Sequence, residues 1–185
     1  MPNIETISYE EARGTLKEAY DHIIESRGKL AEVHKIQSLN PEALLAHMKL
    51  YMVTMFGKSP LRRYQREMLG VIVSAANRCS YCINHHEQAL LVYWKDSEKT
   101  RHLINDRTLL SLSKEDKLLC SLAENMTRNE HQDYTKEIDL LKDTGIDDRA
   151  ILDAVQIISY FNFVNRMVLA LGVEYDEHEM KGYNY

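Results

Sequence analysis

The sequence predicts an all-α protein. Prolines and glycines, which interrupt regular structure, are few: the chain has 3 prolines and 7 glycines in 185 residues. Leu, Ala, Glu and Lys, the residues that favour helices, are abundant throughout. Apolar residues also recur at helical spacing, as at Leu16, Tyr20 and Ile23. We therefore expect a single all-helical domain over residues 1–185.

In the first half of the chain, most expected helices have recognisable start and stop residues. Residues 1–8 are expected to form an extended arm. The expected helices span residues 9–25, 41–56, 60–76 and 79–93, with a short helical or irregular segment at 30–36. Asn40 before Pro41 is an N-cap followed by proline at the first helical position, which is a common helix start. Ser59 before Pro60 repeats this pattern.

The second half of the chain continues in the same way. The expected helices span residues 97–104, 113–126, 132–144 and 147–171. Ser113 and Asp116 have the spacing of a capping box at the start of one of them. Gly145 and Gly172 are expected to end the helices that precede them. The polar tail, residues 174–185, is expected to be ordered only against the body of the protein or a partner.

Charge and hydropathy exclude several protein classes. The net charge of -5 argues against a dedicated nucleic-acid binder, and the basic cluster Arg62, Arg63 and Arg66 is interpreted as a solvated helix face. No apolar run approaches the length of a membrane span, and the N-terminus lacks the pattern of a signal peptide. We therefore expect a cytoplasmic protein in a reducing compartment. There, a close cysteine pair indicates redox chemistry or metal binding more often than a structural disulfide.

The chemistry of the chain is concentrated in the segment 67–86. Cys79 and Cys82 form a C-x-x-C, and His86 follows one helical turn later. On an ideal helix, with successive residues about 100° apart, these three side chains share one face, and His85 points to the side. A helix start lowers the pKa of a nearby thiol, because its free N–H groups and its dipole stabilise the thiolate. Such a thiolate can attack a peroxide, and the resulting sulfenic acid can condense with the second cysteine.

Glu67 lies on the preceding helix, at the edge of its apolar stripe. The break at Asn77 and Arg78 predicts that the two helices form an antiparallel hairpin. Glu67 lies ten residues before this break and His86 eight residues after it, so the hairpin brings the two side chains together. A carboxylate in contact with an imidazole fixes its tautomer and raises its basicity.

Glu67, Cys79, Cys82 and His86 together resemble the motif of the alkylhydroperoxidase AhpD-like family, in the carboxymuconolactone decarboxylase-like superfamily. The words S-A-A-N-R-C-S-Y-C-I-N-H-H and I-S-Y-F-N-F-V-N-R-M are most similar to its peroxidase-related branch. The resemblance is strongest over residues 43–95, which would form the core of the domain. Residues 1–42 would then supply the N-terminal arm and helices, and residues 96–185 the C-terminal helices.

The resemblance implies an AhpD-like helical bundle with the C-x-x-C at a helix N-terminus, and a thiol peroxidase that needs no cofactor or metal. Cys82 would attack the peroxide, Cys79 would resolve the sulfenic acid, and His86 with Glu67 would move protons. A hydroperoxide and a thiol or dithiol reductant would be its partners, and the protein would be a homo-oligomer that binds neither nucleic acid nor membrane. Tyr81 stands where the best-known members have a histidine, and a phenol is a far weaker base.

Other interpretations of these residues remain open. A zinc site could use Cys79, Cys82 and either His86 or His85, with Glu67 as a fourth ligand. The chain could also be a redox-sensing module, or a decarboxylase or lactone enzyme of the superfamily that works without the cysteines. Tyr81 and His85 are expected to line a substrate pocket. Residues expected to have no role in the site are Cys120 in the core and His34, His47, His102, His131 and His178 on the surface.

Overall fold

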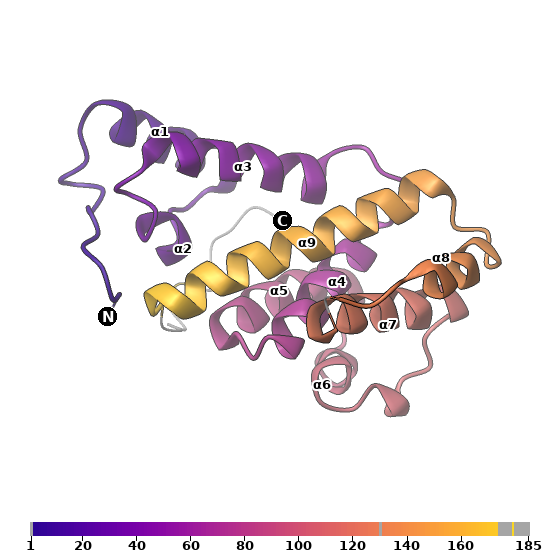
Figure 1. The fold of residues 1–185 in the computed structure, drawn as a ribbon. Coiled ribbons are helices and arrows are strands. Elements are labelled where there is room, and N and C mark those ends of the chain that lie inside the picture. The colour runs from indigo at the N-terminus through magenta and orange to yellow at the C-terminus, as the bar shows by residue number, and fades with distance from the viewer. Residues whose placement is uncertain (1, 130, 174–178, 180–185) are drawn as a thin grey trace.

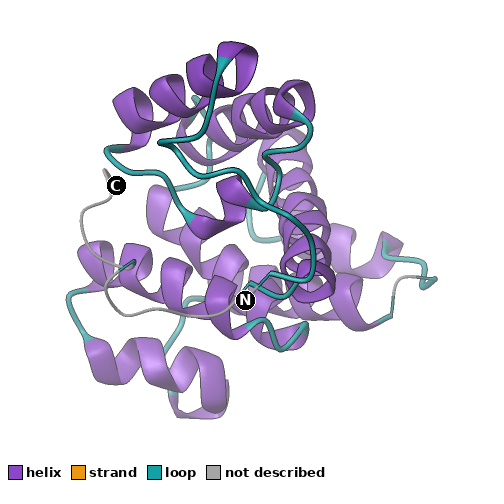
Figure 2. Cartoon of the chain, turned by 90° about the vertical axis from the view of Figure 1, so that its left-hand side faces the viewer, coloured by secondary structure: helices purple, strands orange, loops and turns teal. Residues whose placement is uncertain are grey.

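The computed structural model describes residues 2–129, 131–173 and 179, and it confirms the all-α prediction. The α-helices are α1 (Gly14–Arg27), α2 (Glu32–Lys35), α3 (Pro41–Phe56), α4 (Arg63–Ala76), α5 (Ser80–Trp94), α6 (Ser97–Asn105), α7 (Lys114–Arg128), α8 (Thr135–Lys142) and α9 (Asp148–Leu171). A 3-10 turn, η1 (Arg107–Leu109), follows α6. The described residues contain no strand, and the helices are joined by loops (Figure 2).

The long helix α9 crosses the whole molecule (Figure 1). On one side of it, α1 and α3 pack together around a small apolar cluster that includes Tyr20 and Leu44. On the other side lie α4, α5 and α7, which share the main core with α9. The N-terminal arm is held against this body, because the Ile7 N–H donates to Ser38 Oγ (2.9 Å) and Tyr20 Oη donates to the Ile7 carbonyl (2.9 Å).

The helix α4 lies at the centre of the main core. All its residues from Gln65 to Ser74 are buried, and it packs against α5, α7 and α9. Arg66 is therefore not on a solvated face, as expected from the sequence, but is only 4% exposed. Its guanidinium donates to the carbonyls of Met55, Gly57 and Leu61, which the end of α3 and the following loop leave without helical partners.

Several helix starts differ from the expected positions. α1 begins at Gly14 rather than residue 9, because the segment before it forms a turn closed by the Ala12 N–H on the Ser8 carbonyl. α4 begins at Arg63, where Gln65 Oε1 accepts from the Arg62 N–H, rather than at Pro60.

The expected capping box of α7 forms only in part. Ser113 Oγ accepts from the Asp116 N–H (3.1 Å), as a capping serine does. The Asp116 carboxylate does not return to the helix start, but accepts from Gln65 Nε2 (2.8 Å) and Tyr64 Oη (3.1 Å) on α4. This carboxylate therefore fastens α7 to the central helix.

α9 is long and apolar enough to span a bilayer by length and composition, with a mean hydropathy of 1.3 over its best window. This differs from the sequence-based expectation that no apolar run approaches the length of a membrane span. In the structure α9 behaves as a core helix: Ala154, Ile157, Ile158 and Phe161 are buried against the other helices. The helix therefore packs as the central element of a bundle.

Candidate active site

The turn between α4 and α5 places the first cysteine. Asn77 ends α4, and Arg78 adopts the left-handed conformation with φ of 57°. The chain then reverses, and the Cys79 N–H donates to the Ser74 carbonyl (3.0 Å). Cys79 is the N-cap of α5, so the prediction that the cysteines lie at a helix N-terminus is confirmed.

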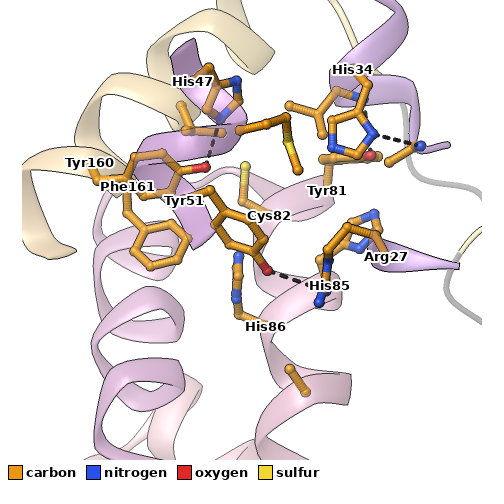
Figure 3. Close-up of a pocket in the computed structure, with 15 residues that line it drawn as sticks. Arg27, His34, His47, Tyr51, Tyr81, Cys82, His85, His86, Tyr160 and Phe161 are labelled. Atoms are coloured by element: carbon orange, nitrogen blue, oxygen red, sulfur yellow. Dashed lines mark hydrogen bonds between the residues drawn. The ribbon is translucent and has the colours of Figure 1, made fainter. Parts of the chain in front are cut away.

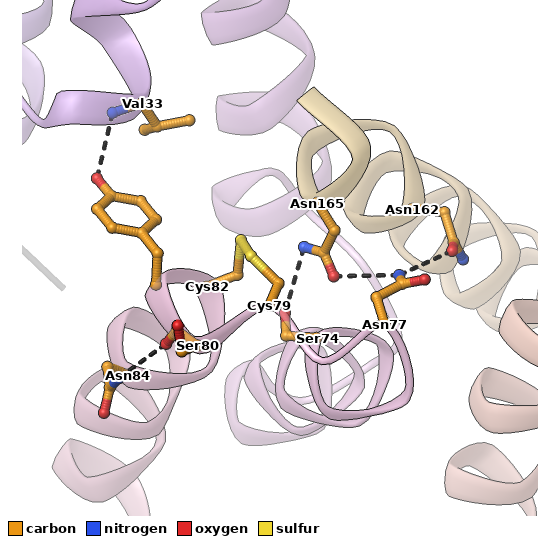
Figure 4. The surroundings of a disulfide bond; sticks show 10 residues. Val33, Ser74, Asn77, Cys79, Ser80, Cys82, Asn84, Asn162 and Asn165 are labelled. Atoms are coloured by element: carbon orange, nitrogen blue, oxygen red, sulfur yellow. Dashed lines mark hydrogen bonds between the residues drawn. A yellow bond between two sulfur atoms is a disulfide. The ribbon is translucent and has the colours of Figure 1, made fainter. Parts of the chain in front are cut away.

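A network of side-chain amides connects this turn to α9 (Figure 4). Asn77 Nδ2 donates to Asn162 Oδ1 (3.0 Å) and to Asn165 Oδ1 (3.1 Å) on α9. Asn165 is completely buried, and its Nδ2 donates to Ser74 Oγ (3.4 Å). Because these bonds join the end of α4 to α9, they fix the position from which α5 starts.

The two cysteines form a disulfide in this structure, and both are nearly inaccessible: Cys79 is 1% exposed and Cys82 is 4% exposed. Their Cα atoms are 5.4 Å apart, within the usual range for a disulfide. The pair can therefore interconvert between dithiol and disulfide without a large backbone movement. Cys82 lies in the first turn of α5, where the helix dipole favours a thiolate once the bond is reduced.

Glu67 and His86 meet across the α4–α5 hairpin. His86 Nδ1 lies 2.8 Å from Glu67 Oε2, and Arg63 Nη2 lies 2.8 Å from Glu67 Oε1. Glu67 is only 1% exposed, so these two partners compensate for the burial of its charge. With Nδ1 donating to the carboxylate, the imidazole keeps Nε2 as a proton acceptor. His86 is one helical turn beyond Cys82, and both side chains line the same cavity.

Gly70 makes room for the imidazole. A Cβ at this position would lie 2.9 Å from two ring atoms of Phe161 and 3.2 Å from His86 Cγ. The ring of Phe161 packs edge-on against the imidazole, with centroids 4.4 Å apart. The side chain of His86 is therefore held between α4 and the aromatic face of α9.

The cavity beside Cys82 has a volume of about 80 Å³ (Figure 3). Its walls come from α1, α2, α3, α5 and α9 and are mostly apolar. The residues that line it are Arg27, Ala31, Val33, His34, His47, Met48, Tyr51, Tyr81, Cys82, His85, His86, Ala89, Tyr160, Phe161 and Val164. The cavity is thus a small aromatic pocket with a thiol position and imidazoles in its wall.

Two histidines of the pocket, His34 and His47, were expected on the surface and are buried instead. His47 Nε2 lies 2.7 Å from Tyr160 Oη and Nδ1 lies 3.0 Å from Gln37 Oε1, while His34 Nδ1 accepts from the Ala31 N–H (3.0 Å). Burial lowers the pKa of His34 to about 3 and the pKa of His47 to about 4. Both rings are therefore neutral at pH 7, and they add no charge to the pocket.

Tyr81 and His85 line the pocket on the α2 side. A residue that the sequence reading did not single out lies directly behind them: Glu179 Oε1 accepts from Tyr81 Oη (2.5 Å) and lies 3.4 Å from His85 Nε2. Burial lowers the pKa of His85. Burial acts to raise the pKa of Glu179, but hydrogen bonds from His85, Tyr81 and the Glu32 N–H together hold it below its usual value.

The proposed zinc site finds no support in this arrangement. In the part of the chain that the structure describes, no group of three or more His, Cys, Asp or Glu side chains is placed to hold a metal ion. The two carboxylate oxygens of Glu67, the expected fourth ligand, already bind Arg63 and His86. Cys120 is a buried core residue, and burial raises the pKa of its thiol to about 12. His178 lies outside the described residues.

Comparisons with known proteins agree with this architecture. Residues 41–93 match the model of the carboxymuconolactone decarboxylase family. No curated protein matches the sequence. Among solved structures, the chain is similar to an uncharacterized peroxidase-related protein from Silicibacter sp. TM1040, with 26% identity, coverage of 89% of this chain and 86% of that one, and a TM-score of 0.81.

Two further structures share the fold at lower identity. The alkylhydroperoxidase AhpD core of an uncharacterized peroxidase-related protein from Ralstonia eutropha JMP134 has 18% identity over 97% of this chain and 94% of that one, with a TM-score of 0.86. The debrominase Bmp8, in complex with 2,3,4-tribromopyrrole, has 16% identity over 96% of this chain and 93% of that one, with a TM-score of 0.80. The fold is therefore AhpD-like over nearly the whole chain.

Proposed function

We propose that this chain is a thiol-dependent peroxidase. The proposal starts from its assignment to the AhpD-like group of the carboxymuconolactone decarboxylase superfamily, which the matches above support. Its substrate is a hydroperoxide, and its catalytic residues are Cys82, Cys79, His86 and Glu67. Electrons come from an external thiol or dithiol, and the protein works as a homo-oligomer.

The catalytic cycle begins with the reduced pair. His86, oriented by Glu67, takes the proton of the Cys82 thiol at Nε2, and the thiolate attacks the terminal oxygen of the hydroperoxide. The O–O bond breaks, Cys82 becomes a sulfenic acid, and the leaving alkoxide takes the proton from His86 to give an alcohol.

The second half of the cycle returns the protein to its starting state. The thiol of Cys79 attacks the sulfur of the sulfenic acid, so that an S–S bond forms and one water leaves. An external dithiol then reduces the disulfide by thiol–disulfide exchange and is itself oxidised. Each turn therefore consumes one hydroperoxide and one dithiol, and it yields one alcohol and one water.

The observation that supports this proposal most is the contact between His86 Nδ1 and Glu67 Oε2 at 2.8 Å, beside a cysteine pair that can close a disulfide. A buried hydrogen bond of this kind alone could be purely structural, and a cysteine pair alone could be inert. Together they bring a candidate proton acceptor and a candidate nucleophile to one cavity, with the second cysteine bonded to Cys82, and this supports the proposal.

Peroxide consumption by the reduced protein tests the proposal. In stopped-flow measurements with tert-butyl hydroperoxide and a dithiol reductant, the wild type should turn over, and Cys82→Ser should lose activity completely. Without the reductant, Cys79→Ser should consume a single equivalent of peroxide and end as a Cys82 sulfenic acid, whereas the wild type ends as a Cys79–Cys82 disulfide. Cys120→Ser is the matched control, because this thiol is buried in the core away from the cavity. Equal rates in the wild type and Cys82→Ser would refute the proposal.

A second candidate uses the same dithiol to remove a halogen from a small arene. The small aromatic pocket favours it, and the fold is shared with a debrominase. In this reaction the dithiol supplies two electrons, a carbon–halogen bond is replaced by a carbon–hydrogen bond, and halide and a disulfide are released. Halide release from 2,3,4-tribromopyrrole without peroxide turnover would favour this candidate. A decarboxylase of the superfamily is favoured instead if the cysteine variants retain turnover of a carboxylated lactone.

A further inference from the structure

Glu179 carries a buried carboxylate next to the cysteine-bearing turn of α5. The residue is only 7% exposed. Its Oε1 accepts from Tyr81 Oη (2.5 Å) and from the Glu32 N–H (2.9 Å), and it lies 3.4 Å from His85 Nε2. Its backbone carbonyl accepts from Lys29 Nζ (2.8 Å). Because a carboxylate is costly to bury without such partners, these contacts hold the Glu179 side chain in one defined position.

The contacts of Glu179 join two walls of the pocket. Tyr81 and His85 belong to α5, whereas Glu32 starts α2 and Lys29 precedes it. The C-cap residue of α2, Ile36, is buried in the main core, and Val33 packs against that core. Polar bonds also join this region to α5: those through Glu179, and the bond from the Val33 N–H to Tyr81 Oη (3.2 Å).

The wall that Glu179 secures limits the size of the pocket. Ala31, Val33 and His34, from the α2 region, line the cavity together with Tyr81, Cys82 and His85 of α5. The volume of about 80 Å³ is well below the roughly 300–1,000 Å³ of typical small-molecule pockets. As long as α2 stays in place, only a compact molecule can approach the sulfur of Cys82.

We propose that Glu179 is a specificity-determining residue, which fastens α2 to α5 and thereby restricts access to Cys82 to compact, apolar molecules. The corresponding substrates are compact organic hydroperoxides rather than long-chain lipid hydroperoxides. This choice of substrate rests on the peroxidase function proposed above, whereas the restriction on access does not.

Thiol labelling tests the restriction without any peroxide. In a Cys79→Ser, Cys120→Ser background, Cys82 is the only thiol of the chain, which has 3 cysteines. We compare the rates at which N-ethylmaleimide and the bulky N-pyrenylmaleimide label Cys82. Each rate is divided by the rate at which the same reagent reacts with free glutathione, which corrects for its intrinsic reactivity. In the parent protein, the relative labelling rate should be much higher with N-ethylmaleimide than with N-pyrenylmaleimide. Glu179→Ala should raise the relative rate of the bulky reagent at least about tenfold, given the strength of hydrogen bonds to charged groups.

Matched variants make the result specific. Glu42→Ala removes an exposed carboxylate from the first turn of α3 and should leave the labelling ratio unchanged. Tyr81→Phe keeps Glu179 but removes the hydroxyl that bonds both Glu179 and the Val33 N–H, so it should shift the ratio in the same direction as Glu179→Ala. Thermal melts of each variant show that the labelled protein is folded. An unchanged ratio in folded Glu179→Ala and Tyr81→Phe overturns the proposal.

Peroxide kinetics then test the substrate class. With the native cysteines, the wild type should show a much higher kcat/KM for tert-butyl hydroperoxide than for linoleic acid hydroperoxide. Glu179→Ala should reduce this difference by lowering the KM for linoleic acid hydroperoxide. If the wild type consumes neither peroxide but the labelling ratio still depends on Glu179, the peroxidase proposal fails and the restriction on access stands. A wild type that prefers the lipid hydroperoxide refutes the inferred substrate class.

Discussion

His86 Nδ1 lies 2.8 Å from Glu67 Oε2, although 19 residues and a chain reversal separate the two side chains. The second carboxylate oxygen binds Arg63 one turn earlier on α4. The carboxylate is thus held from both sides, and the imidazole has one defined orientation next to the cysteine pair. This relationship makes the role of Glu67 testable separately from that of the cysteines.

Glu67→Gln should slow the attack on peroxide without preventing folding. The amide keeps the shape of the side chain but has one acceptor oxygen in place of the two that bind Arg63 and His86, so it no longer fixes the orientation and tautomer of the imidazole. We expect the second-order rate constant with tert-butyl hydroperoxide to fall by about 100-fold, at the lower end for general acid–base groups. Stopped-flow kinetics of the reduced protein measure it. Glu42→Gln, an exposed carboxylate, is the control, and a Glu67→Gln rate within twofold of the wild type would rule out the proton-transfer role.

The sequence predicted this part of the site because the information is local. The C-x-x-C, the break at Asn77 and Arg78, and the nearly equal distances of Glu67 and His86 from that break all lie within a single helical hairpin. Helix starts marked by a capping side chain, such as Asn40 and Ser113, were also predicted close to their positions. Pro60 was misleading, because Ser59 bonds the Leu61 N–H in a turn instead of capping α4.

The rest of the pocket could not be predicted because it depends on long-range packing. His34 and His47 are isolated histidines on separate helices, with nothing in the sequence around them to distinguish them from surface residues. His47 is buried because α3 packs against α9, where Tyr160 bonds the imidazole, and His34 is buried in the wall of the pocket that α2 forms. Glu179 lies 98 residues from Tyr81 in a polar stretch, where a buried carboxylate is not expected.

Gly70→Ala should destabilise the protein although alanine favours helices. The added Cβ would lie 2.9 Å from the ring of Phe161 and 3.2 Å from His86, and neither ring can move far between packed helices. We expect a loss of about 1–3 kcal/mol in the free energy of unfolding, as for other overpacked cores. Urea denaturation measures it, and peroxide turnover should fall as well because His86 is displaced. Gln88→Ala, at an exposed position of α5, should change stability little. A Gly70→Ala protein as stable as the wild type would contradict this packing.

Arg78→Gly should be tolerated, whereas Arg78→Val should not. Arg78 has a φ of 57°, a region that glycine enters freely and β-branched residues avoid. We expect Val to cost about 1–3 kcal/mol of stability, and Gly to remain within about 1 kcal/mol of the wild type. Arg101→Val, at an exposed position of α6, controls for the loss of charge. Thermal unfolding of the variants decides the matter, and equal stabilities of Arg78→Val and Arg78→Gly would show that the turn is not constrained.

His47 should make the protein less stable in acid. Burial lowers its pKa from 6.5 to about 4, so between these values the unfolded chain binds a proton that the folded protein does not. Stability therefore falls as the pH decreases from 6.5 and levels off below about 4, with a contribution of about 3 kcal/mol from this residue. His34, with a pKa of about 3, adds a loss that continues to lower pH.

His47→Gln isolates this contribution. Its amide can still reach Tyr160 or Gln37 but takes up no proton, so the free energy of unfolding should depend less on pH between 6.5 and 4 than in the wild type. At pH 7 the variant should be less stable, because one of the two hydrogen bonds of the imidazole is lost. The two stability curves should therefore converge as the pH decreases. Urea denaturation across this range is the measurement, and His22→Gln, at an exposed position of α1, should follow the wild type. Parallel curves for His47→Gln and the wild type would show that folding does not lower the pKa of His47.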